Sequence, residues 1–155
     1  MMDLKGYILW IAVSEGVGGL SAWLTREGMK IYNAAAIKPP LSPPPIVFAI
    51  VWPILYLLMG IGMARAMKAP ESVERSRAKS LYFLQLAMNF CWSILFFNLR
   101  GYGFAFIWLV AMWIAIVLMA MSFYSLDKPA GLMQIPYILW VIFAGYLNFM
   151  TWQLN

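Results

Sequence analysis

A proline-rich segment runs directly into an apolar one in the stretch Lys38-Pro-Pro-Leu-Ser-Pro-Pro-Pro-Ile-Val-Phe-Ala-Ile-Val-Trp-Pro53. Residues 38–45 hold five of the 9 prolines in the chain. Because proline fixes φ and disfavours helix at the residue before it, residues 38–44 are expected to be extended and stiff. Proline is tolerated in the first turn of a helix, so the next helix can begin at Pro44 or Pro45. The same pattern also fits an ordinary proline-rich turn before a membrane helix.

The apolar half of this stretch is expected to form a long helix that carries Trp52 and Tyr56 on one face. Pro53 lies inside this helix and has no N–H to donate to the carbonyl oxygen of Ala49. We therefore expect a bend in the helix and a free acceptor beside Trp52.

The composition of the whole chain indicates its class. Of the 155 residues, 64% are hydrophobic and 11% are charged, and the mean hydropathy is +0.78. A soluble domain has about a quarter charged residues, and a membrane-spanning helix needs about 20 predominantly apolar ones. Five such runs occur: Gly6–Leu24, Pro45–Met67, Ser80–Leu99, Gly103–Leu126 and Ala130–Leu154. The sequence thus predicts an all-α membrane protein, a bundle of five transmembrane helices that forms a single domain over residues 1–155.

The connections between these spans predict how the protein is oriented. We expect a polar first loop over Arg26–Ile37 and a solvated charged loop over Lys68–Lys79. With five spans, the N-terminus shares a side with the second and fourth loops. That side holds 7 of the 11 basic residues: Lys5, Arg65, Lys68, Arg75, Arg77, Lys79 and Lys128. Since lysine and arginine are enriched in cytoplasmic loops, we expect the N-terminus in the cytoplasm and the first loop and C-terminus outside.

Several kinds of function have little support in this chain. The net charge of +5 comes from residues beside apolar spans, where they orient helices, so we expect no nucleic-acid partner. The chain has no histidine and one cysteine, Cys91. It therefore has almost none of the side chains that a zinc site, a haem-ligating centre or a Ser-His catalytic centre requires. We expect no metal site and no resident cofactor.

Glu15 lies near the middle of the first span. An ionisable group at that depth is costly unless it faces a cavity or a partner, which makes Glu15 a functional candidate. Equally, its carboxyl can stay protonated and hydrogen-bond within the bundle. Small multidrug-resistance transporters also carry a glutamate in their first helix, where a proton and a cationic drug compete. A small proton-coupled multidrug transporter that uses Glu15 is therefore the alternative function, although those transporters have four helices.

Two other spans carry polar and aromatic residues at helical spacing. The residues that share a face are Gln85, Asn89, Trp92 and Phe96 in the third span, and Tyr137, Trp140, Ala144 and Asn148 in the fifth. Buried amides in hydrocarbon need partners, so these faces are expected to point inward, toward other helices or toward a ligand. Contact between helices is the commoner role for such amides.

Blocks of sequence in the first loop and in the second, third and fifth spans match one known family in order and separation. They are Lys38-Pro39, Pro43-Pro44, Val47-Phe48, Val51-Trp52 and Leu55-Tyr56-Leu57-Leu58-Met59-Gly60; then Gln85-Leu86, Asn89, Trp92 and Leu95-Phe96-Phe97; and finally Pro136-Tyr137, Leu139-Trp140, Phe143-Ala144, Leu147-Asn148 and Trp152. Through these blocks the chain resembles the TspO/translocator-protein family, also called tryptophan-rich sensory proteins or peripheral benzodiazepine receptors.

The resemblance implies a compact bundle of five transmembrane helices, usually dimeric, with a pocket that the first loop caps. Proteins of this family bind tetrapyrroles such as protoporphyrin IX, and some bind sterols or benzodiazepine-type drugs. Some bacterial members are linked to light-dependent porphyrin degradation through pocket tryptophans. We therefore expect a homodimeric tetrapyrrole-binding protein in the cell membrane of a prokaryote, acting as a sensor, transporter or regulator and with possible light-dependent porphyrin degradation.

The resemblance also assigns ligand-binding roles to individual residues. These are Trp52, Asn89, Trp140 and Ala144, with Tyr56, Trp92 and Phe104 as weaker additions and Pro39, Pro43 and Pro44 in the loop. Trp52 and Trp140 have a catalytic role only if photodegradation occurs. Basic residues near the pocket mouth that could meet propionate groups are Arg26, Lys30 and Lys38. The sterol motif of animal members needs a tyrosine and a terminal basic residue, and Leu147-Asn-Phe-Met-Thr-Trp-Gln153 has neither.

Overall fold

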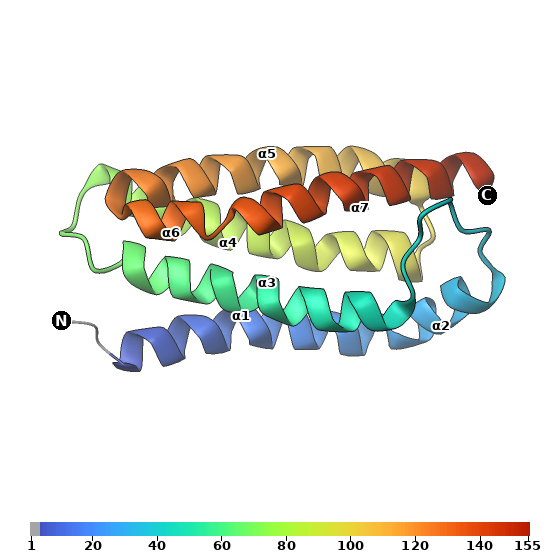
Figure 1. The fold of residues 1–155 in the computed structure, drawn as a ribbon, viewed down its shortest axis with the longest axis horizontal. Helices are drawn as coiled ribbons and strands as arrows, with labels where there is room; N and C mark the ends of the chain where they lie inside the picture. Colours follow the sequence, from blue (N-terminus) through green and yellow to red (C-terminus); the bar gives the residue numbers. More distant parts are fainter. Residues whose placement is uncertain (1–3) are drawn as a thin grey trace.

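The computed structural model describes residues 4–155, which form helices joined by short connections (Figure 1). The long helices are α1 (Leu4–Leu24), α3 (Pro45–Ala66), α4 (Val73–Ser93), α5 (Tyr102–Leu126) and α7 (Ile135–Leu154). The short ones are α2 (Arg26–Ala35), α6 (Lys128–Leu132) and the π-helical turn η1 (Ile94–Asn98). Five segments are long and apolar enough to cross a membrane, so the predicted all-α bundle with five spans is confirmed.

The long helices run side by side along one axis of the molecule (Figure 1). Helix α1 packs along α3, α4 packs along α5, and α5 packs along α7. Helix α2, the connection into α3 and the C-terminus lie together at one end of the bundle, and α6 lies at the other (Figure 1). Helices α3 and α7 face each other mainly through side chains, without the close backbone spacing of the other neighbouring pairs.

Helices α1 and α3 approach closely because glycine lies between them. A Cβ atom on Gly60 would come within 2.6 Å of the Ile11 Cα atom and 2.8 Å of the Ile11 nitrogen. Gly18 of α1 in turn leaves room for the ring of Tyr56. Small residues at a membrane helix interface allow backbones to meet in this way, so van der Waals contact can hold the pair together.

The bundle is apolar outside and partly polar inside, as expected for a protein surrounded by lipid. Large apolar side chains are exposed on the outer faces, including Ile107, Leu118 and Ile142. The amides of Gln85 and Asn89 are buried, as the sequence predicts for this face of the third span. A buried polar group in hydrocarbon must be hydrogen-bonded inside the protein, so these amides determine how the helices are paired.

The prediction of a polar loop over Arg26–Ile37 was wrong, because most of this segment forms the helix α2. Only Thr25 separates α2 from α1, and the Met29 N–H donates to the Thr25 carbonyl oxygen at 2.8 Å. A Cβ on Gly28 would come within 2.7 Å of the Phe97 carbonyl oxygen, so α2 lies directly on η1. Polarity alone indicated a loop, but α2 has one polar face exposed and one face packed on the bundle.

Two other boundaries differ from the sequence prediction. Helix α4 begins at Val73, inside the expected charged loop, because the Ser72 hydroxyl caps it by accepting a hydrogen bond from the Arg75 N–H at 3.1 Å. The last span is interrupted at residues 133–134, between α6 and α7. Asp127 caps α6 by accepting from the Ala130 N–H at 3.0 Å, so this short helix begins two residues before the expected span.

The proline-rich stretch forms the predicted helix start. Helix α3 begins at Pro45 and stays helical through Pro53; the bend expected at Pro53 remains a prediction. The segment before it is less extended than expected, because it turns at residues 40–41 and Leu41 has a φ of 69°. Both the N–H and the hydroxyl of Ser42 donate to the Pro39 carbonyl oxygen, at 3.3 and 2.8 Å, which closes this turn.

Candidate ligand-binding site

A hydrogen-bonded network of four side chains crosses the middle of the bundle. Asn89 of α4 accepts a hydrogen bond from the Tyr56 hydroxyl at 3.2 Å and donates its amide N–H to the Tyr137 hydroxyl at 2.7 Å. The Tyr137 hydroxyl then donates to the Gln85 side-chain oxygen at 2.7 Å. All four side chains are buried. The network joins α3, α4 and α7, and it places the Asn89 amide between two protein partners.

A second polar contact lies nearer the α2 end. The Trp92 indole N–H donates to the Asn148 side-chain oxygen at 2.9 Å, and the Asn148 amide donates to the Tyr102 carbonyl oxygen at 2.8 Å. The Trp92 ring stacks on Phe96, with ring centroids 5.1 Å apart. The polar atom of Trp92 therefore already has a protein partner, and its aromatic face supports the end of α4.

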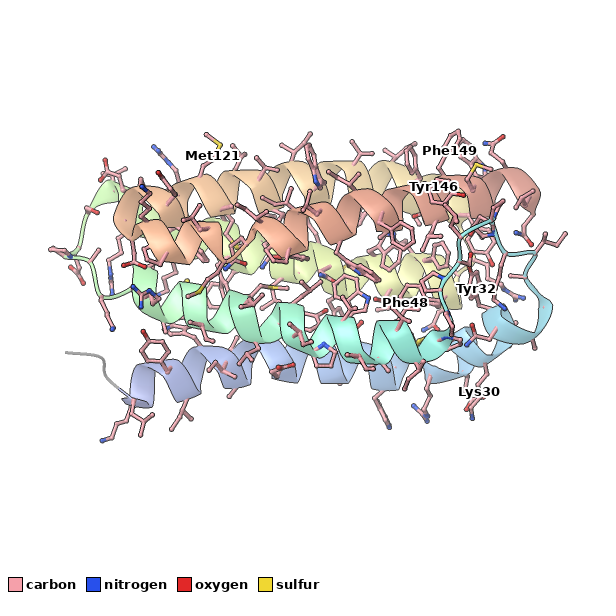
Figure 2. All side chains as sticks on the ribbon, viewed as in Figure 1. Lys30, Tyr32, Phe48, Met121, Tyr146 and Phe149 are labelled. Atoms are coloured by element: carbon pink, nitrogen blue, oxygen red, sulfur yellow. The ribbon has the colours of Figure 1, made fainter. Side chains whose placement is uncertain are left out.

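Aromatic rings fill the space between α3 and α7. Trp52 of α3 meets Tyr137 of α7 edge-on, with centroids 6.3 Å apart, and Phe48 of α3 meets Trp140 of α7 at 5.7 Å. Trp52 also packs against Tyr56 at 5.8 Å. Figure 2 shows Phe48 near the α2 end of the bundle, below the connection into α3. Side chains rather than backbones therefore bridge the two helices.

A groove of about 400 Å³ lies between these two helices, within the size range of small-molecule sites. We call it the α3–α7 groove. Its walls are apolar and are formed by Val51, Ile54 and Leu55 of α3 and by Pro136, Leu139, Trp140 and Phe143 of α7.

Trp140 in this groove has an unpaired hydrogen-bond donor. Its indole N–H is buried and finds no acceptor among residues 4–155. The other buried side-chain atom without a partner in the described chain is the Gln134 oxygen, at the break between α6 and α7. An unsatisfied buried donor costs about 1–3 kcal/mol, so an acceptor on a bound molecule would remove that cost at Trp140.

The connection from α2 to α3 lies at the α2 end of the bundle (Figure 1), and the pocket that the resemblance implies beneath it remains a prediction. We call residues 36–44 the cover segment. Pro39 is buried, Pro43 is half-buried and Pro44 is exposed at the start of α3. The Tyr146 hydroxyl of α7 donates to the Pro40 carbonyl oxygen at 2.7 Å, and Figure 2 shows Tyr146 close to this segment.

Most of the residues that the sequence assigned to a site lie in or beside this region. Tyr56 and Asn89 belong to the buried network, Trp52 and Trp140 to the rings between α3 and α7, and Ala144 is buried on α7. Phe104 is different. It is 58% exposed on α5 and packs against Trp108 with centroids 6.2 Å apart, so the structure does not bring it to the other residues.

Sequence reasoning placed Tyr137 on the correct face but did not include it in the site, although it contacts Trp52 and holds Asn89 and Gln85. Its position three residues before Trp140 was the available signal.

The basic residues expected at the pocket mouth have partners within the α1–α2 region. Arg26 donates to the Trp23 carbonyl oxygen at 2.6 Å, and Lys38 donates to the Asn33 carbonyl oxygen at 2.8 Å. Lys30 forms an exposed ion pair with Glu27 at 3.3 Å, of the kind that contributes little to stability. These contacts are exposed to solvent, so a bound carboxylate can compete with them.

Glu15, the candidate of the alternative function, is partly exposed on α1. Its carboxylate forms no hydrogen bond or ion pair with any of residues 4–155. The buried hydrogen-bonded side chain at this level of α1 is instead its neighbour Ser14, whose hydroxyl lies 2.6 Å from that of Tyr82. Glu15 is thus not part of the network around Asn89.

The shortest ion pair among residues 4–155 lies at the opposite end of the bundle. The Arg65 Nε atom of α3 donates to the Asp127 Oδ2 atom at 2.7 Å, just before α6. This hydrogen bond from Arg65 holds the pKa of Asp127 below its ordinary value. The pair fixes the end of α3 to the α5–α6 connection.

Length, composition and packing together define an integral membrane protein of five transmembrane helices with an apolar groove between α3 and α7. Residues 10–153 match the model of the TspO/MBR family, and the chain belongs to that family.

Relatives from bacteria, archaea and animals are similar over nearly their whole lengths. The chain is 34% identical to the tryptophan-rich protein TspO of Chlorobaculum tepidum, over 95% of this chain and 94% of that protein. It is 34% identical to the protein of the same name from Archaeoglobus fulgidus, over 99% of both chains. It is 38% identical to the translocator protein of Bos taurus, over 89% of this chain and 83% of that one. The membership predicted from sequence blocks is confirmed.

Proposed function

We propose that this protein binds a tetrapyrrole such as protoporphyrin IX between α3 and α7. The observation that carries the proposal is the buried indole N–H of Trp140, which has no acceptor in the described chain and belongs to a side chain that lines an apolar groove. A tetrapyrrole offers a wide flat face for the surrounding rings and polar atoms at its edge. Apolar lining with few polar groups is typical of small-molecule sites.

The geometry favours a flat ligand over a bulky one. Trp52 and Trp140 come from facing helices, and each already meets a ring of the other helix. A macrocycle that replaces these ring contacts can stack on one indole and accept a hydrogen bond from the other. Propionate groups would lie toward the α2 end, where Lys30 and Lys38 are exposed.

In the cell we propose a homodimer in a prokaryotic membrane, with the N-terminus in the cytoplasm and the cover segment outside. Through tetrapyrrole binding, the protein would act as a sensor, transporter or regulator. Light-dependent degradation of the bound porphyrin is the enzymatic extension of the same proposal, with Trp52 and Trp140 as the residues that an excited porphyrin would oxidise.

The direct test is a titration of purified protein in lipid nanodiscs with protoporphyrin IX, first in darkness and then under light. Saturable binding is expected from the change in the porphyrin absorbance band. The matched variants are Trp140→Phe, which removes the unpaired donor but keeps an aromatic ring, and Trp23→Phe, which makes the same change at an exposed position on α1. Equal affinity of wild type and Trp140→Phe would contradict the assigned site.

A further inference from the structure

The α3–α7 groove lies on the outer surface of the bundle, halfway along the membrane-spanning helices. Figure 1 shows α3 and α7 on the near face, with α4 more distant and drawn fainter. Ile54 is the tenth of the 22 residues of α3, and Leu139 is the twelfth of the 27 residues of the last span. Ile54 is therefore about 14 Å along the helix axis from the start of α3, roughly half the thickness of a hydrocarbon core.

The burial of the lining side chains shows in which direction the groove opens. Leu55 is 2% exposed and lies deepest, whereas Ile54 is 50% exposed and Leu139 is 60% exposed. Trp140 is half-buried, between these extremes. The exposed fraction thus rises from Leu55 to Ile54 and Leu139, which we call the rim. The groove opens sideways at this rim, away from the interior of the bundle.

The surface around the rim is apolar. The outward-facing residues next to it along the two helices are Ile50, Leu57, Ile135 and Ile142. Helix α3 has no charged residue before Arg65, and the last span has none after Lys128. Because these side chains offer water no hydrogen-bonding group in the middle of the spans, lipid chains are the medium that the rim meets.

The polar group that Trp140 adds to the groove suits a ligand from this medium. Its buried N–H has no acceptor among residues 4–155 and can donate one hydrogen bond, but it carries no charge. Moving an ionised group from water into an apolar site costs far more free energy than one hydrogen bond returns. A molecule that is already dissolved in the bilayer has left water beforehand, so its entry into the groove does not carry that cost.

We propose that the α3–α7 groove opens into the hydrocarbon core of the membrane between Ile54 and Leu139, and that the protein takes up its ligand through this rim from the lipid. The inference rests on the proposed binding function and adds the class of ligand. That class is a flat apolar molecule dissolved in the bilayer, whose charged groups stay outside the groove. Among tetrapyrroles it includes the uncharged dimethyl ester of protoporphyrin IX and excludes uroporphyrin, which has eight carboxylates.

The first measurement needs no ligand. A nitroxide spin label is attached to Leu139→Cys in a Cys91→Ala background, and the protein is placed in lipid nanodiscs. Collisions of the label are then measured with molecular oxygen, which concentrates in hydrocarbon, and with a nickel chelate, which stays in water. The label at residue 139 is expected to meet oxygen often and the nickel chelate rarely.

Two further labels calibrate this result. Ile114→Cys places the label at an outward position of α5 that is 51% exposed, and Glu71→Cys places it in the connection between α3 and α4, where the side chain is 94% exposed. Leu139→Cys should resemble Ile114→Cys. Access of the nickel chelate to residue 139 that equals its access to residue 71 would overturn the opening into lipid.

The second measurement tests the rim as the route of entry. Binding of protoporphyrin IX is followed in darkness from its absorbance by stopped-flow mixing. Leu139→Trp narrows the rim, so the association and dissociation rate constants should both fall on the order of tenfold, with a dissociation constant within about threefold of wild type. Leu139→Ala widens the rim and should raise both rate constants.

The matched control is Ile114→Trp, which adds the same ring to an outward position away from the groove and should bind at wild-type rates. The opposite effects of Leu139→Trp and Leu139→Ala separate passage through the rim from damage to the fold, because damage would not accelerate binding in one variant and slow it in the other. Equal rate constants in wild type and both Leu139 variants would overturn the route.

The third measurement tests the class of ligand. The dimethyl ester should bind with a dissociation constant within about tenfold of that of the free acid, because exposed lysines contribute little to holding the propionates. Uroporphyrin should not bind in the same concentration range. Binding of uroporphyrin without binding of the ester would overturn the proposed class. If wild type bound neither protoporphyrin IX nor its ester, the proposed function would be refuted, and the spin labels would still decide whether the groove opens into lipid.

Discussion

The Asn89 amide and the Tyr137 hydroxyl meet at 2.7 Å in the centre of the bundle, and this contact ties α4 to α7. It lies beside the α3–α7 groove, and the other end of the Asn89 amide accepts from Tyr56 of α3. The network also lies next to the aromatic rings between α3 and α7, because Tyr137 meets Trp52 edge-on. Its members tie together three of the long helices.

Asn89→Leu is expected to destabilise the protein, because it leaves the Tyr56 hydroxyl without its acceptor and removes one of the two hydrogen bonds of the Tyr137 hydroxyl. Leaving buried polar groups unsatisfied costs about 1–3 kcal/mol, so the free energy of unfolding should fall by that order. Denaturant unfolding in mixed micelles measures it, with Asn33→Leu on the exposed side of α2 as the control. An unchanged free energy would mean that the network contributes nothing to stability. Ligand affinity of the folded fraction should also fall, by roughly tenfold, if the amide contacts the ligand.

Trp140→Phe should weaken protoporphyrin IX binding by about tenfold, because phenylalanine still stacks but cannot donate a hydrogen bond. The dissociation constant measured in darkness tests this. Trp52→Phe is expected to have a smaller effect on affinity. If the control Trp23→Phe, at an exposed position, lost more affinity for protoporphyrin IX than Trp140→Phe, the ligand would have to bind elsewhere.

Illumination separates degradation from binding. If a pocket indole takes part, Trp140→Phe and Trp52→Phe should lose most of the degradation even at saturating porphyrin, because phenylalanine is much harder to oxidise than tryptophan. The measured quantity is the rate at which porphyrin absorbance is lost under fixed light. Equal rates for wild type, both variants and porphyrin in empty nanodiscs would contradict the proposed degradation activity, and the proposed function would then be binding alone.

Glu15→Gln should leave porphyrin affinity within about threefold, a change below about 0.7 kcal/mol, because Glu15 lies outside the buried network. The alternative transporter function is tested by measuring proton-coupled drug efflux from cells that express the protein. Efflux that is present in wild type and abolished in Glu15→Gln would favour the alternative transporter function.

The Arg65–Asp127 pair makes stability depend on acidity. Its hydrogen bond lowers the folded-state pKa of Asp127, so the carboxylate contributes stability above the unfolded-state pKa, ordinarily about 3.9. That contribution is lost as the pH falls through the lower, folded-state pKa. Asp127→Asn should therefore reduce the difference in thermal stability between pH 7 and pH 3. The same difference in both proteins would show that the pair has no net effect, as is common for partly exposed ion pairs.

The sequence was sufficient for those features that depend on local periodicity. The apolar spans and the inward direction of Gln85 and Asn89 follow from spacing along single helices, and the structure confirms them. It was also sufficient for the start of α3, because a run of prolines can only precede a helix or occupy its first turn.

Contacts between distant residues could not be predicted in this way. Asn89 and Tyr137 are 48 residues apart, and nothing in either helix alone indicates that they are paired. Phe104 is an aromatic residue like others assigned to the site, but on α5 its side chain faces outward. This orientation depends on how α5 packs against the other helices, which the sequence of α5 alone does not indicate. Helix α2 was missed because its polar residues suggested a loop, whereas Gly28 allows it to rest on η1.

The close contact at Gly60 has a mechanical consequence for the molecule as a whole. With their backbones touching there, α1 and α3 should move as a unit, whereas α3 and α7 meet through side chains and have no such backbone contact. Membrane helices accommodate a change in bilayer thickness by tilting. We expect tilting of α7 relative to the α1–α3 pair to change the width of the α3–α7 groove, so that this width follows the thickness of the surrounding lipid.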